Sequence, residues 1–454
     1  MKIKNALVVT MDAKKRILNN TTINIKNDRI MDISTSDSKE KTSDHDSDND
    51  VIDARGMVVL PGLVNCHVHT VQTLFRSVTD NLRLLSWLQK YIYPMEGVMN
   101  TEEVYTSSLM GYAEMIRAGT TTCADMQSVR HVDKAFQAAD KIGIRATIAK
   151  AMMDSEIIPE NLREDTSSSI KESRRLIKCW DKTDNGRLRG MFGPRFIQGC
   201  STKLLKEIAE IANIEDIGIH IHAAEDLDEV KKDTQRYKKR SVETLYDFGL
   251  IGPKNILAHC IHINDREFNI LSENASNVAH CPSSNLKLSS GICRLSDFLK
   301  RKINITIGVD GAACNNNLDI FKDMRLAALL SKISKGSRTF TVSAMDILEM
   351  ATKSGAKALG LDDTIGSIER GRKADLTIVS LRNIETVPIF NIPDQLVYAT
   401  DGHNVETVII DGKVVLKNRQ LTQVDEADLI SESQIKAEQI AEKSGIDRKI
   451  VNLN

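Results

Sequence analysis

The sequence PGLVNCHVHT, at residues 61–70, places His67 and His69 two positions apart after a run of apolar and β-branched residues. Side chains two apart in a β-strand point to the same face, so both imidazoles face one side where this strand ends. Two imidazoles in that arrangement can bind one divalent metal. An isolated His-x-His pair is a weak signal, so the remainder of the chain has to support it.

Three further apolar stretches end in residues of a metal-binding type. GIHIHAAED contains His222 and Glu225, NILAHCIH contains His259, and NITIGVDGAA contains Asp310. In a (β/α)₈ barrel the carboxyl ends of the parallel strands meet at one face, where the active sites of that fold lie. The four strand ends therefore predict one site on an α/β barrel of the TIM type.

The order of strand-like and helix-like segments supports this fold. From residue 57 to about residue 361, strand-like runs alternate with amphipathic segments such as residues 102–118 and 201–211. Such alternation predicts a parallel sheet, and its length suits a closed barrel. We therefore assign residues 57–364 to the barrel.

Short strands are expected on both sides of the barrel. They lie at residues 4–10, 22–26 and 51–53, and again at 374–380, 405–410 and 413–416, with Asp411-Gly412 as a turn. We predict that residues 1–56 and 365–454 together form a small β-sandwich, with a helix near residues 425–443. Residues 35–50 are nearly all charged, Ser or Thr, which predicts a mobile loop.

Composition limits the classes of protein to consider. The 454 residues carry 61 basic and 62 acidic side chains, so no basic excess points to nucleic acid or an acidic membrane. No stretch approaches the ~20 apolar residues of a membrane span, and the first apolar run is too short for a signal peptide. Eight cysteines without CxxC pairs fit reduced thiols, so we expect a cytoplasmic protein. Cys66 is interpreted as a core residue.

We predict that His67, His69, His222 and Asp310 bind one divalent metal. Neutral imidazoles and a carboxylate suit Zn²⁺, while Fe²⁺ and Mn²⁺ remain alternatives. A metal with an open position lowers the pKa of a bound water from about 15.7 towards 7. A single strand-end histidine is more often structural, and Asp310 could simply begin a turn. Residues of the right type at four separate strand ends favour the metal site.

Three residues are predicted to take part in the chemistry. Glu225 could accept the proton of the water and deliver it to a substrate nitrogen. His259 could hydrogen-bond the attacking oxygen, and Asp310 could orient the water as well as bind the metal. Glu225 could instead be a solvated acid at a helix start. His220 shares the face of His222 but lies deeper, and His280 could line the pocket.

These motifs, with VAHCPSSNLKLSSGI and IGVDGAACNNNLDIFKDMRLAALL, resemble the amidohydrolase superfamily, in its cytosine-deaminase-related branch. The resemblance covers nearly the whole chain and is greatest to the methylthioadenosine/S-adenosylhomocysteine deaminases, with guanine deaminases and triazine chlorohydrolases nearby. It implies a homo-oligomer with a single metal and no bridging carboxylated lysine. Lys150, in TIAKAM, is the lysine to check.

The same resemblance gives two patterns for the substrate. SWLQKYIYPMEG resembles the stretch of adenosine-type deaminases whose glutamate binds ribose hydroxyls, and it puts Glu96 in that place. Arg195 stands where that family has histidine, and it resembles guanine deaminase, as does Gln72. Arginine and glutamine can donate to a ring carbonyl, which adenine lacks; Arg195 could also hold a carboxylate or bridge loops. We expect Gln72 and Arg195 beside the metal and Glu96 near the outer rim of the pocket.

The resemblance thus implies an aminohydrolase that removes an exocyclic amino group from an adenosine derivative, such as methylthioadenosine or S-adenosylhomocysteine, or from a related purine. A guanine, oxopurine or pterin deaminase, a triazine-type chlorohydrolase and a non-catalytic barrel scaffold are the alternatives. Retention of all four predicted ligands argues against the scaffold. The expected partners are a small heterocyclic substrate and water, with no nucleic acid and no membrane.

Overall fold

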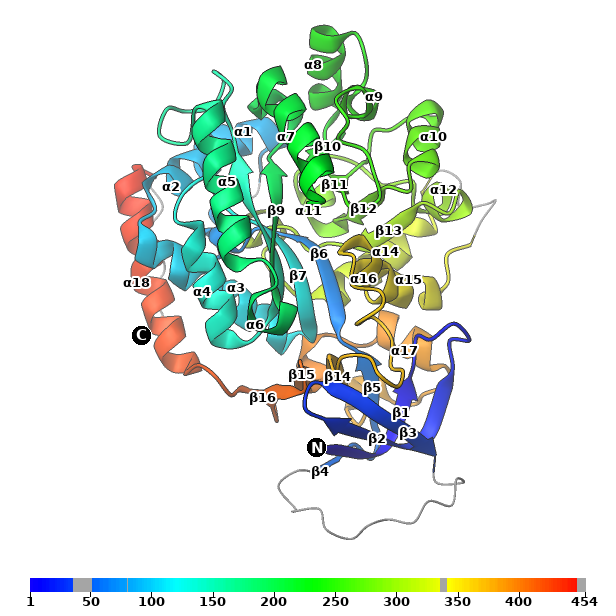
Figure 1. The fold of residues 1–454 in the computed structure, drawn as a ribbon. Coiled ribbons are helices and arrows are strands. Elements are labelled where there is room, and N and C mark those ends of the chain that lie inside the picture. The colour runs from blue at the N-terminus through cyan, green and yellow to red at the C-terminus, as the bar shows by residue number, and fades with distance from the viewer. Residues whose placement is uncertain (36–50, 80, 335–340, 447–454) are drawn as a thin grey trace.

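The structure, a computed structural model, describes residues 1–35, 51–79, 81–334 and 341–446. Two parallel sheets lie among helices, and one larger sheet, at the bottom of Figure 1, is built from both ends of the chain. The predicted α/β class is therefore confirmed. The predicted loop at residues 35–50 lies, apart from Thr35, outside the described residues.

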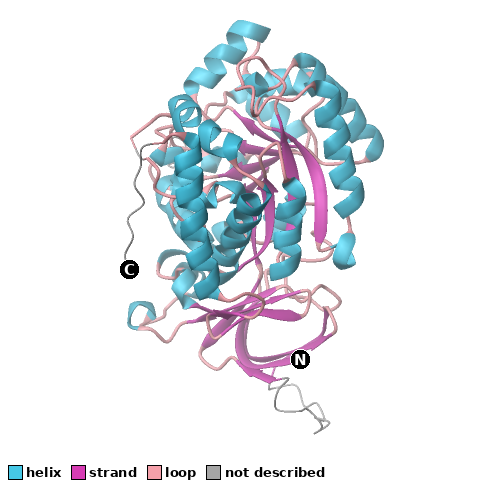
Figure 2. Cartoon of the chain, turned by 90° about the vertical axis from the view of Figure 1, so that its left-hand side faces the viewer, coloured by secondary structure: helices cyan, strands magenta, loops and turns pink. Residues whose placement is uncertain are grey.

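The two parallel sheets have four strands each, in the orders β6-β7-β8-β9 and β10-β11-β12-β13. Every residue of β7 and β8 is buried, as expected for strands that helices cover on both faces (Figure 2). The strands are β6 (Leu63–Val68), β7 (Thr120–Met126), β8 (Arg145–Met152), β9 (Leu188–Pro194), β10 (His220–Ala223), β11 (Ile256–His259), β12 (Asn277–His280) and β13 (Asn304–Ile307).

Backbone contacts join the two sheets at both of their edges. Parallel bridges pair Phe192 with Ile219 and Phe196 with His222, between β9 and β10. At the other edge, the backbone N–H groups of Val309 and Asp310, after β13, donate to the carbonyl of His67 at 3.1 and 2.9 Å. The eight strands therefore follow one another in chain order, with contact at both junctions.

Helices follow most of these strands. The longest, α3, begins with a capping box of Asn100 and Glu103, and α4 ends at Gly143, whose φ of 84° is left-handed. The helices of this region are α3 (Thr101–Arg117), α4 (Val132–Ile142), α5 (Thr166–Trp180), α7 (Thr202–Glu215), α8 (Leu227–Tyr237), α9 (Ser241–Asp247), α10 (Asp265–Glu273), α12 (Leu295–Lys300), α14 (Ile320–Ser331), α15 (Ala344–Met350) and α16 (Lys353–Ala358).

Shorter helical segments occupy the loops. They are η2 (Thr70–Phe75), α1 (Leu84–Trp87), η3 (Leu88–Ile92), α2 (Tyr93–Val98), α6 (Thr183–Gly186), η4 (Ile197–Gly199), α11 (Pro282–Lys287), α13 (Ala312–Asn315), η5 (Ile384–Thr386), α17 (Ile392–Tyr398) and η6 (Gly402–Asn404). Near the C-terminus, α18 (Glu426–Ser444) packs against α2 and α3. The helix predicted near residues 425–443 is thus confirmed.

The larger sheet has nine strands, in the order β17-β16-β15-β14-β5-β1-β2-β3, with β4 beside β1. The strands are β1 (Lys2–Val9), β2 (Ile17–Lys26), β3 (Arg29–Thr35), β4 (Val51–Asp53), β5 (Met57–Pro61), β14 (Leu376–Ser380), β15 (Val405–Ile410), β16 (Lys413–Lys417) and β17 (Gln420–Leu421). The two chain ends therefore meet as predicted, whereas their division into a sandwich stays a prediction. β5 pairs with β1 and β14, so it belongs to this sheet.

A buried ionic cluster connects the nine-stranded sheet to β8. Arg145 donates to both carboxylate oxygens of Asp375, at 2.7 and 3.0 Å, and to Asp411 at 3.2 Å. Lys373 donates to Asp411 at 2.6 Å and to Asp28 at 2.5 Å. These five residues come from both chain ends and the middle of the chain, so the cluster fixes how the two regions pack.

Two further predictions concern the chain as a whole. Within the described residues, no helix has both the length and the apolar character needed to cross a membrane. All eight cysteines are free thiols, and Cys66 is fully buried, as predicted for a core residue.

Candidate active site

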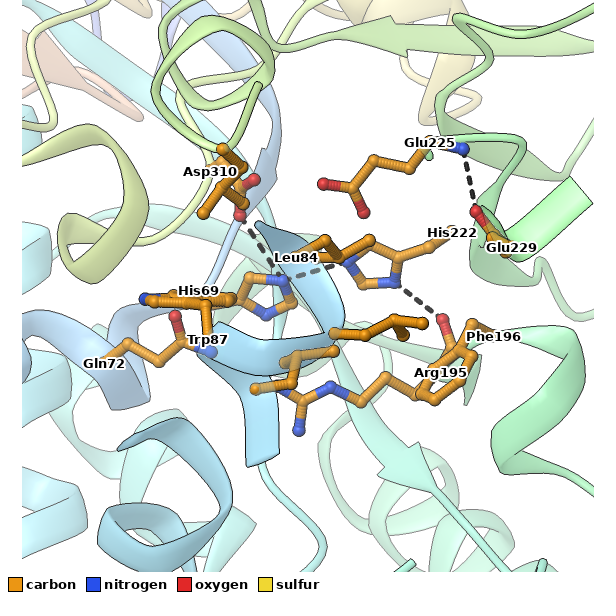
Figure 3. A pocket seen from close by; sticks show the side chains of 13 residues that line it. His69, Gln72, Leu84, Trp87, Arg195, Phe196, His222, Glu225, Glu229 and Asp310 are labelled. Atoms are coloured by element: carbon orange, nitrogen blue, oxygen red, sulfur yellow. Dashed lines mark hydrogen bonds and ion pairs between the residues drawn. The ribbon is translucent and has the colours of Figure 1, made fainter. Parts of the chain in front are cut away.

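The predicted metal ligands lie together at the carboxyl ends of β6, β10 and β13. Figure 3 shows three of them, His69, His222 and Asp310. One ring nitrogen from each of His67, His69 and His222 falls within 4.8 Å of the others. Asp310 Oδ1 lies 3.5 Å from the Nε2 atoms of both His67 and His69. The structure thus brings together the four residues that the sequence selected.

The hydrogen-bond partners of the ring nitrogens show whether these four side chains can bind a metal. His69 Nδ1 contacts the carbonyl of Met126 at 2.7 Å, and His222 Nδ1 contacts the carbonyl of Arg195 at 2.6 Å. A carbonyl only accepts, so each Nδ1 carries the proton and each Nε2 presents a lone pair. These two Nε2 atoms are 3.1 Å apart. Two facing lone pairs repel one another, and a cation between them removes that repulsion, so the donor set fits a metal such as Zn²⁺.

Burial sets the charge of the group. It lowers the pKa of His67 to about 4 and that of His222 well below its ordinary value, so both rings are neutral ligands. Burial alone would raise the pKa of Asp310, but the hydrogen bond and charge of His67, with His69 and His259, hold it well below its usual range. The site therefore offers neutral nitrogens and one carboxylate.

Glu225 and His259 stand beside these ligands. Glu225 Oε2 lies 3.5 Å from His259 Nε2, and His259 Nε2 lies 3.9 Å from Asp310 Oδ2. Asn285 fixes the His259 ring through its Nδ1 at 2.8 Å, and Ser284 donates to Asp310 at 2.6 Å. Burial, helped by the charges of Asp310 and Asp226, raises the pKa of Glu225 well above its ordinary value. A raised pKa brings the acid and base forms of this carboxyl group closer in free energy near neutral pH, which suits a group that both takes up and returns a proton.

Backbone conformation contributes to this arrangement. His259 has a φ of 75° and Asp310 a φ of 61°, both in the left-handed region that non-glycine residues rarely occupy. Such conformations cost of order 1–3 kcal/mol each and cluster at functional sites. The surrounding hydrogen bonds hold both side chains where the strands end.

A cavity opens beside the cluster. His69, His222, Glu225 and Asp310 form its polar end, and Gln72 and Arg195 line it as predicted. The remaining wall is mostly apolar and contains Leu84, Leu85, Trp87, Leu88, Phe196 and Leu288. A mostly apolar wall with a few polar groups gathered at one end suits a small organic ligand.

The three predicted substrate-binding residues form one hydrogen-bonded unit. Arg195 donates from Nη1 to Glu96 Oε2 at 2.7 Å and from Nη2 to Glu96 Oε1 at 3.0 Å. Gln72 Nε2 donates to Glu96 Oε1 at 2.9 Å, and Ser128 donates to Oε2 at 3.2 Å. Glu96 is only 4% exposed, so it lies inside the protein instead of at the outer rim where we expected it. Burial opposes the ionisation of Glu96, but the charge of Arg195 lowers its pKa overall.

Other sequence interpretations can be checked in the same way. His220 is buried, and its Nε2 lies 2.8 Å from His67 Nδ1, so it sits behind a ligand. His280 is buried and is absent from the cavity wall. Lys150 Nζ is bound by Glu164, by Ser169 at 3.4 Å and by the carbonyl of Ala151 at 3.1 Å, so it does not reach the ligand cluster.

Sequence reasoning missed several residues of the site. Ser284 and Asn285 lie in AHCPSSN, where small polar residues follow a strand, but nothing in that pattern identifies their partners. Glu229, four residues after Glu225, lines the cavity and accepts the backbone N–H of Glu225 at 2.8 Å. The apolar wall at residues 84–88 had a visible signal, since LLSWL is strongly apolar within a loop region.

The chain matches the model of the amidohydrolase family over residues 58–415. It is 39% identical over 442 residues to the 5'-deoxyadenosine deaminase of Methanosarcina acetivorans, covering 97% of this chain and 98% of the relative. It is 36% identical to the 5-methylthioadenosine/S-adenosylhomocysteine deaminase of Thermoanaerobacter pseudethanolicus, over 93% and 95% of the two chains. A zinc-containing adenosine deaminase structure from Xanthomonas campestris superposes with a TM-score of 0.89 at 29% identity, over 97% and 98% of the two chains.

Proposed function

The chain belongs to the amidohydrolase family, and from that premise we propose that it is a single-metal aminohydrolase that deaminates an adenosine derivative. One observation carries this proposal. The Nε2 atoms of His69 and His222, the ring of His67 and the carboxylate of Asp310 converge beside Glu225, at the polar end of a small-molecule cavity. The similar proteins that carry deaminase names support it.

We assign the metal to His67, His69, His222 and Asp310, and expect one Zn²⁺ per chain. When bound, the metal lowers the pKa of a coordinated water, which makes hydroxide available near neutral pH. The zinc in the similar adenosine deaminase structure supports this choice. Lys150 is engaged with Glu164 and Ser169, which favours one metal over a lysine-bridged pair.

Glu225 moves the proton in this mechanism. Its carboxylate takes a proton from the attacking water and returns it to the ring nitrogen next to the amino-bearing carbon. The second proton of the water, on the new hydroxyl group of the tetrahedral carbon, passes to the amino group; the C–N bond then breaks, a C=O bond forms and ammonia leaves. His259, held by Asn285, points its Nε2 between Glu225 and Asp310, where it contacts the oxygen that develops negative charge. Asp310 orients the water as well as binding the metal.

Glu96 is the proposed acceptor for the ribose hydroxyls. Its carboxylate is held by Arg195 and Gln72, which both line the cavity, and carboxylate oxygens can accept further hydrogen bonds. Both terminal nitrogens of Arg195 already bind Glu96, which weighs against the guanine-type interpretation in which Arg195 reads a ring carbonyl. The names of the similar proteins point to 5'-deoxyadenosine, methylthioadenosine or S-adenosylhomocysteine as substrate.

The rest of the molecule is interpreted on the same basis. We infer that the two parallel sheets form one closed (β/α)₈ barrel. The contacts of β9 with β10, and of the residues after β13 with β6, support this closure. Residues 1–56 and 365–454 form the second domain, and β5 extends its sheet. A cytoplasmic location and a homo-oligomer complete the proposal.

Ammonia release from a panel of substrates tests the function. The panel contains 5'-deoxyadenosine, methylthioadenosine, S-adenosylhomocysteine, guanine, a pterin and an aminotriazine, and metal content is measured on the same preparation. We expect about one zinc per chain and the highest kcat/KM with an adenosine derivative. Preference for guanine would move the assignment to the oxopurine alternative. Two tightly bound metals, or no ammonia from any compound, would overturn the proposal.

A further inference from the structure

His220 is a buried histidine that the proposed mechanism does not use. It lies on β10, two residues before His222, and its side chain is fully buried. Its Nε2 is 2.8 Å from His67 Nδ1, so the two imidazoles share one hydrogen bond. His220 Nδ1 has no hydrogen-bond partner among the described residues. Within the part of the chain that the structure describes, His220 belongs to none of the groups whose ligand atoms could together hold a metal.

The partner of His67 differs in kind from the partners of the other two histidine ligands. His69 and His222 each direct Nδ1 at a backbone carbonyl, which can only accept a proton. Those contacts fix the proton on Nδ1 and leave Nε2 free to bind a metal. An imidazole can either donate or accept, so the contact with His220 does not by itself decide which nitrogen of His67 carries the proton.

The geometry allows two proton arrangements. In one, His67 Nδ1–H donates to His220 Nε2, the proton of His220 sits on Nδ1, and His67 Nε2 has a lone pair. In the other, His220 Nε2–H donates to His67 Nδ1, and His67 Nε2 carries a proton that faces Asp310 Oδ1 at 3.5 Å. Each ring keeps one proton in both cases. Only the first arrangement lets His67 bind a metal.

We propose that His220 is a positioning residue for the metal centre, which accepts the Nδ1 proton of His67 and so sets the tautomer in which His67 binds zinc. Partners of this kind orient metal ligands, and their loss typically weakens metal binding 10–100-fold. The inference rests on the metal site of the proposed function. It adds that a side chain, and not a backbone carbonyl as for His69 and His222, holds the proton of His67 on Nδ1 and so leaves Nε2 free to bind the metal.

Replacement of His220 by two side chains of similar size separates the hydrogen bond from packing. His220→Gln keeps an acceptor oxygen near the position of Nε2, whereas His220→Met removes it. Zinc affinity is measured by competition with a chelator of known affinity, and the melting temperature of each variant is recorded with and without zinc. We expect the zinc Kd to rise 10–100-fold in His220→Met and to stay within about threefold of the wild-type value in His220→Gln.

His280→Met is the matched control, because His280 is a buried histidine on β12, two strands away from β10 in the same sheet, and among the described residues its side chain makes no hydrogen bond to a ligand ring. It should leave the zinc Kd unchanged. If His220→Met does not fold, His220→Asn replaces it, since its shorter side chain does not reach His67. Wild-type affinity in the variant without an acceptor, or equal weakening in the glutamine variant, overturns the inference. Failure of the wild-type protein to bind zinc instead overturns the proposed function.

In the folded wild-type protein, ¹⁵N spectra of histidine-labelled samples read the tautomers directly. Zinc should move the proton of His220 to Nδ1. A His220 signal that stays protonated at Nε2 in the zinc-bound protein contradicts the proposal.

Discussion

At the scale of single residues, Glu225 is where the chemistry can be tested most directly. Glu225→Gln preserves the size of the side chain but cannot accept and return a proton. We expect kcat to fall by at least roughly 10²-fold, the scale of general acid–base catalysis, with an unchanged zinc content. Steady-state ammonia release and metal analysis on the same sample check this. A variant that works at nearly the wild-type rate would assign the proton transfer to another group.

The Arg195–Glu96 pair leads to a second residue-scale prediction. Arg195→Met leaves a buried carboxylate without its cation, and breaking such a pair costs about 2–5 kcal/mol in binding contexts. We expect kcat/KM for a nucleoside to fall strongly, while hydrolysis of the free base adenine, which has no ribose, changes little. The double variant with Glu96→Gln should lose less than the sum of the two single losses. A selective loss with guanine would instead favour a carbonyl contact by Arg195.

At the scale of elements, the sequence predicted the positions of strands that are defined by a local run of apolar residues. Residues 405–410 and 51–53 match β15 and β4, because apolar and β-branched runs between turn residues define strands. β3 was missed, since RIMDIST is short and mixes polar with apolar residues. β5 was grouped with the wrong sheet, because pairing partners are decided by tertiary contacts. For the same reason the contact of Arg195 with Glu96, 99 residues apart, could not be predicted.

Gly308 shows how closely β13 approaches its neighbours. A Cβ atom there would lie 2.8 Å from His67 Cβ and 2.9 Å from Cys281 Sγ. Gly308→Ala should therefore push the chain that carries Asp310 away from β6, lower stability by about 1–3 kcal/mol and weaken zinc binding. Gly252→Ala is the control, since its Cβ would meet nothing closer than 3.9 Å. Chemical unfolding and chelator competition measure both effects; wild-type zinc affinity in Gly308→Ala contradicts the prediction.

At the scale of the whole molecule, the ionic cluster around Arg145 governs stability. Arg145→Met leaves Asp375 buried without its cation, and loss of one partner of a buried pair costs about 3–5 kcal/mol. Arg175→Met removes an exposed ion pair with Asp133 and Glu172 and should cost less than about 1 kcal/mol. Unfolding in urea compares the two variants. Equal stability of both would show that the buried cluster does not hold the two regions together.

The same cluster predicts a response to acid. The hydrogen bond from Lys373 lowers the pKa of Asp28 from 3.8 to about 2. A lowered folded-state pKa contributes stability above about pH 4, and this contribution is lost as the pH falls towards 2. Lys373→Met should therefore destabilise the protein most at pH 5 and progressively less towards pH 3. Urea unfolding at several pH values measures the difference, and a constant difference contradicts the assignment.

The pairing of β5 with β14 constrains the order in which the chain can fold during synthesis. One edge of β5 pairs with β1 soon after both strands leave the ribosome, whereas its other edge pairs with residues 376–380, roughly 300 residues later. At 5–20 residues per second, that edge stays uncovered for on the order of 15–60 s. The parallel sheets can be complete before the nine-stranded sheet closes. A nascent chain that stops before residue 376 therefore presents an unpaired β-edge to other chains. We expect chaperones to bind the nascent chain mainly while the residues between β5 and β14 are being synthesised.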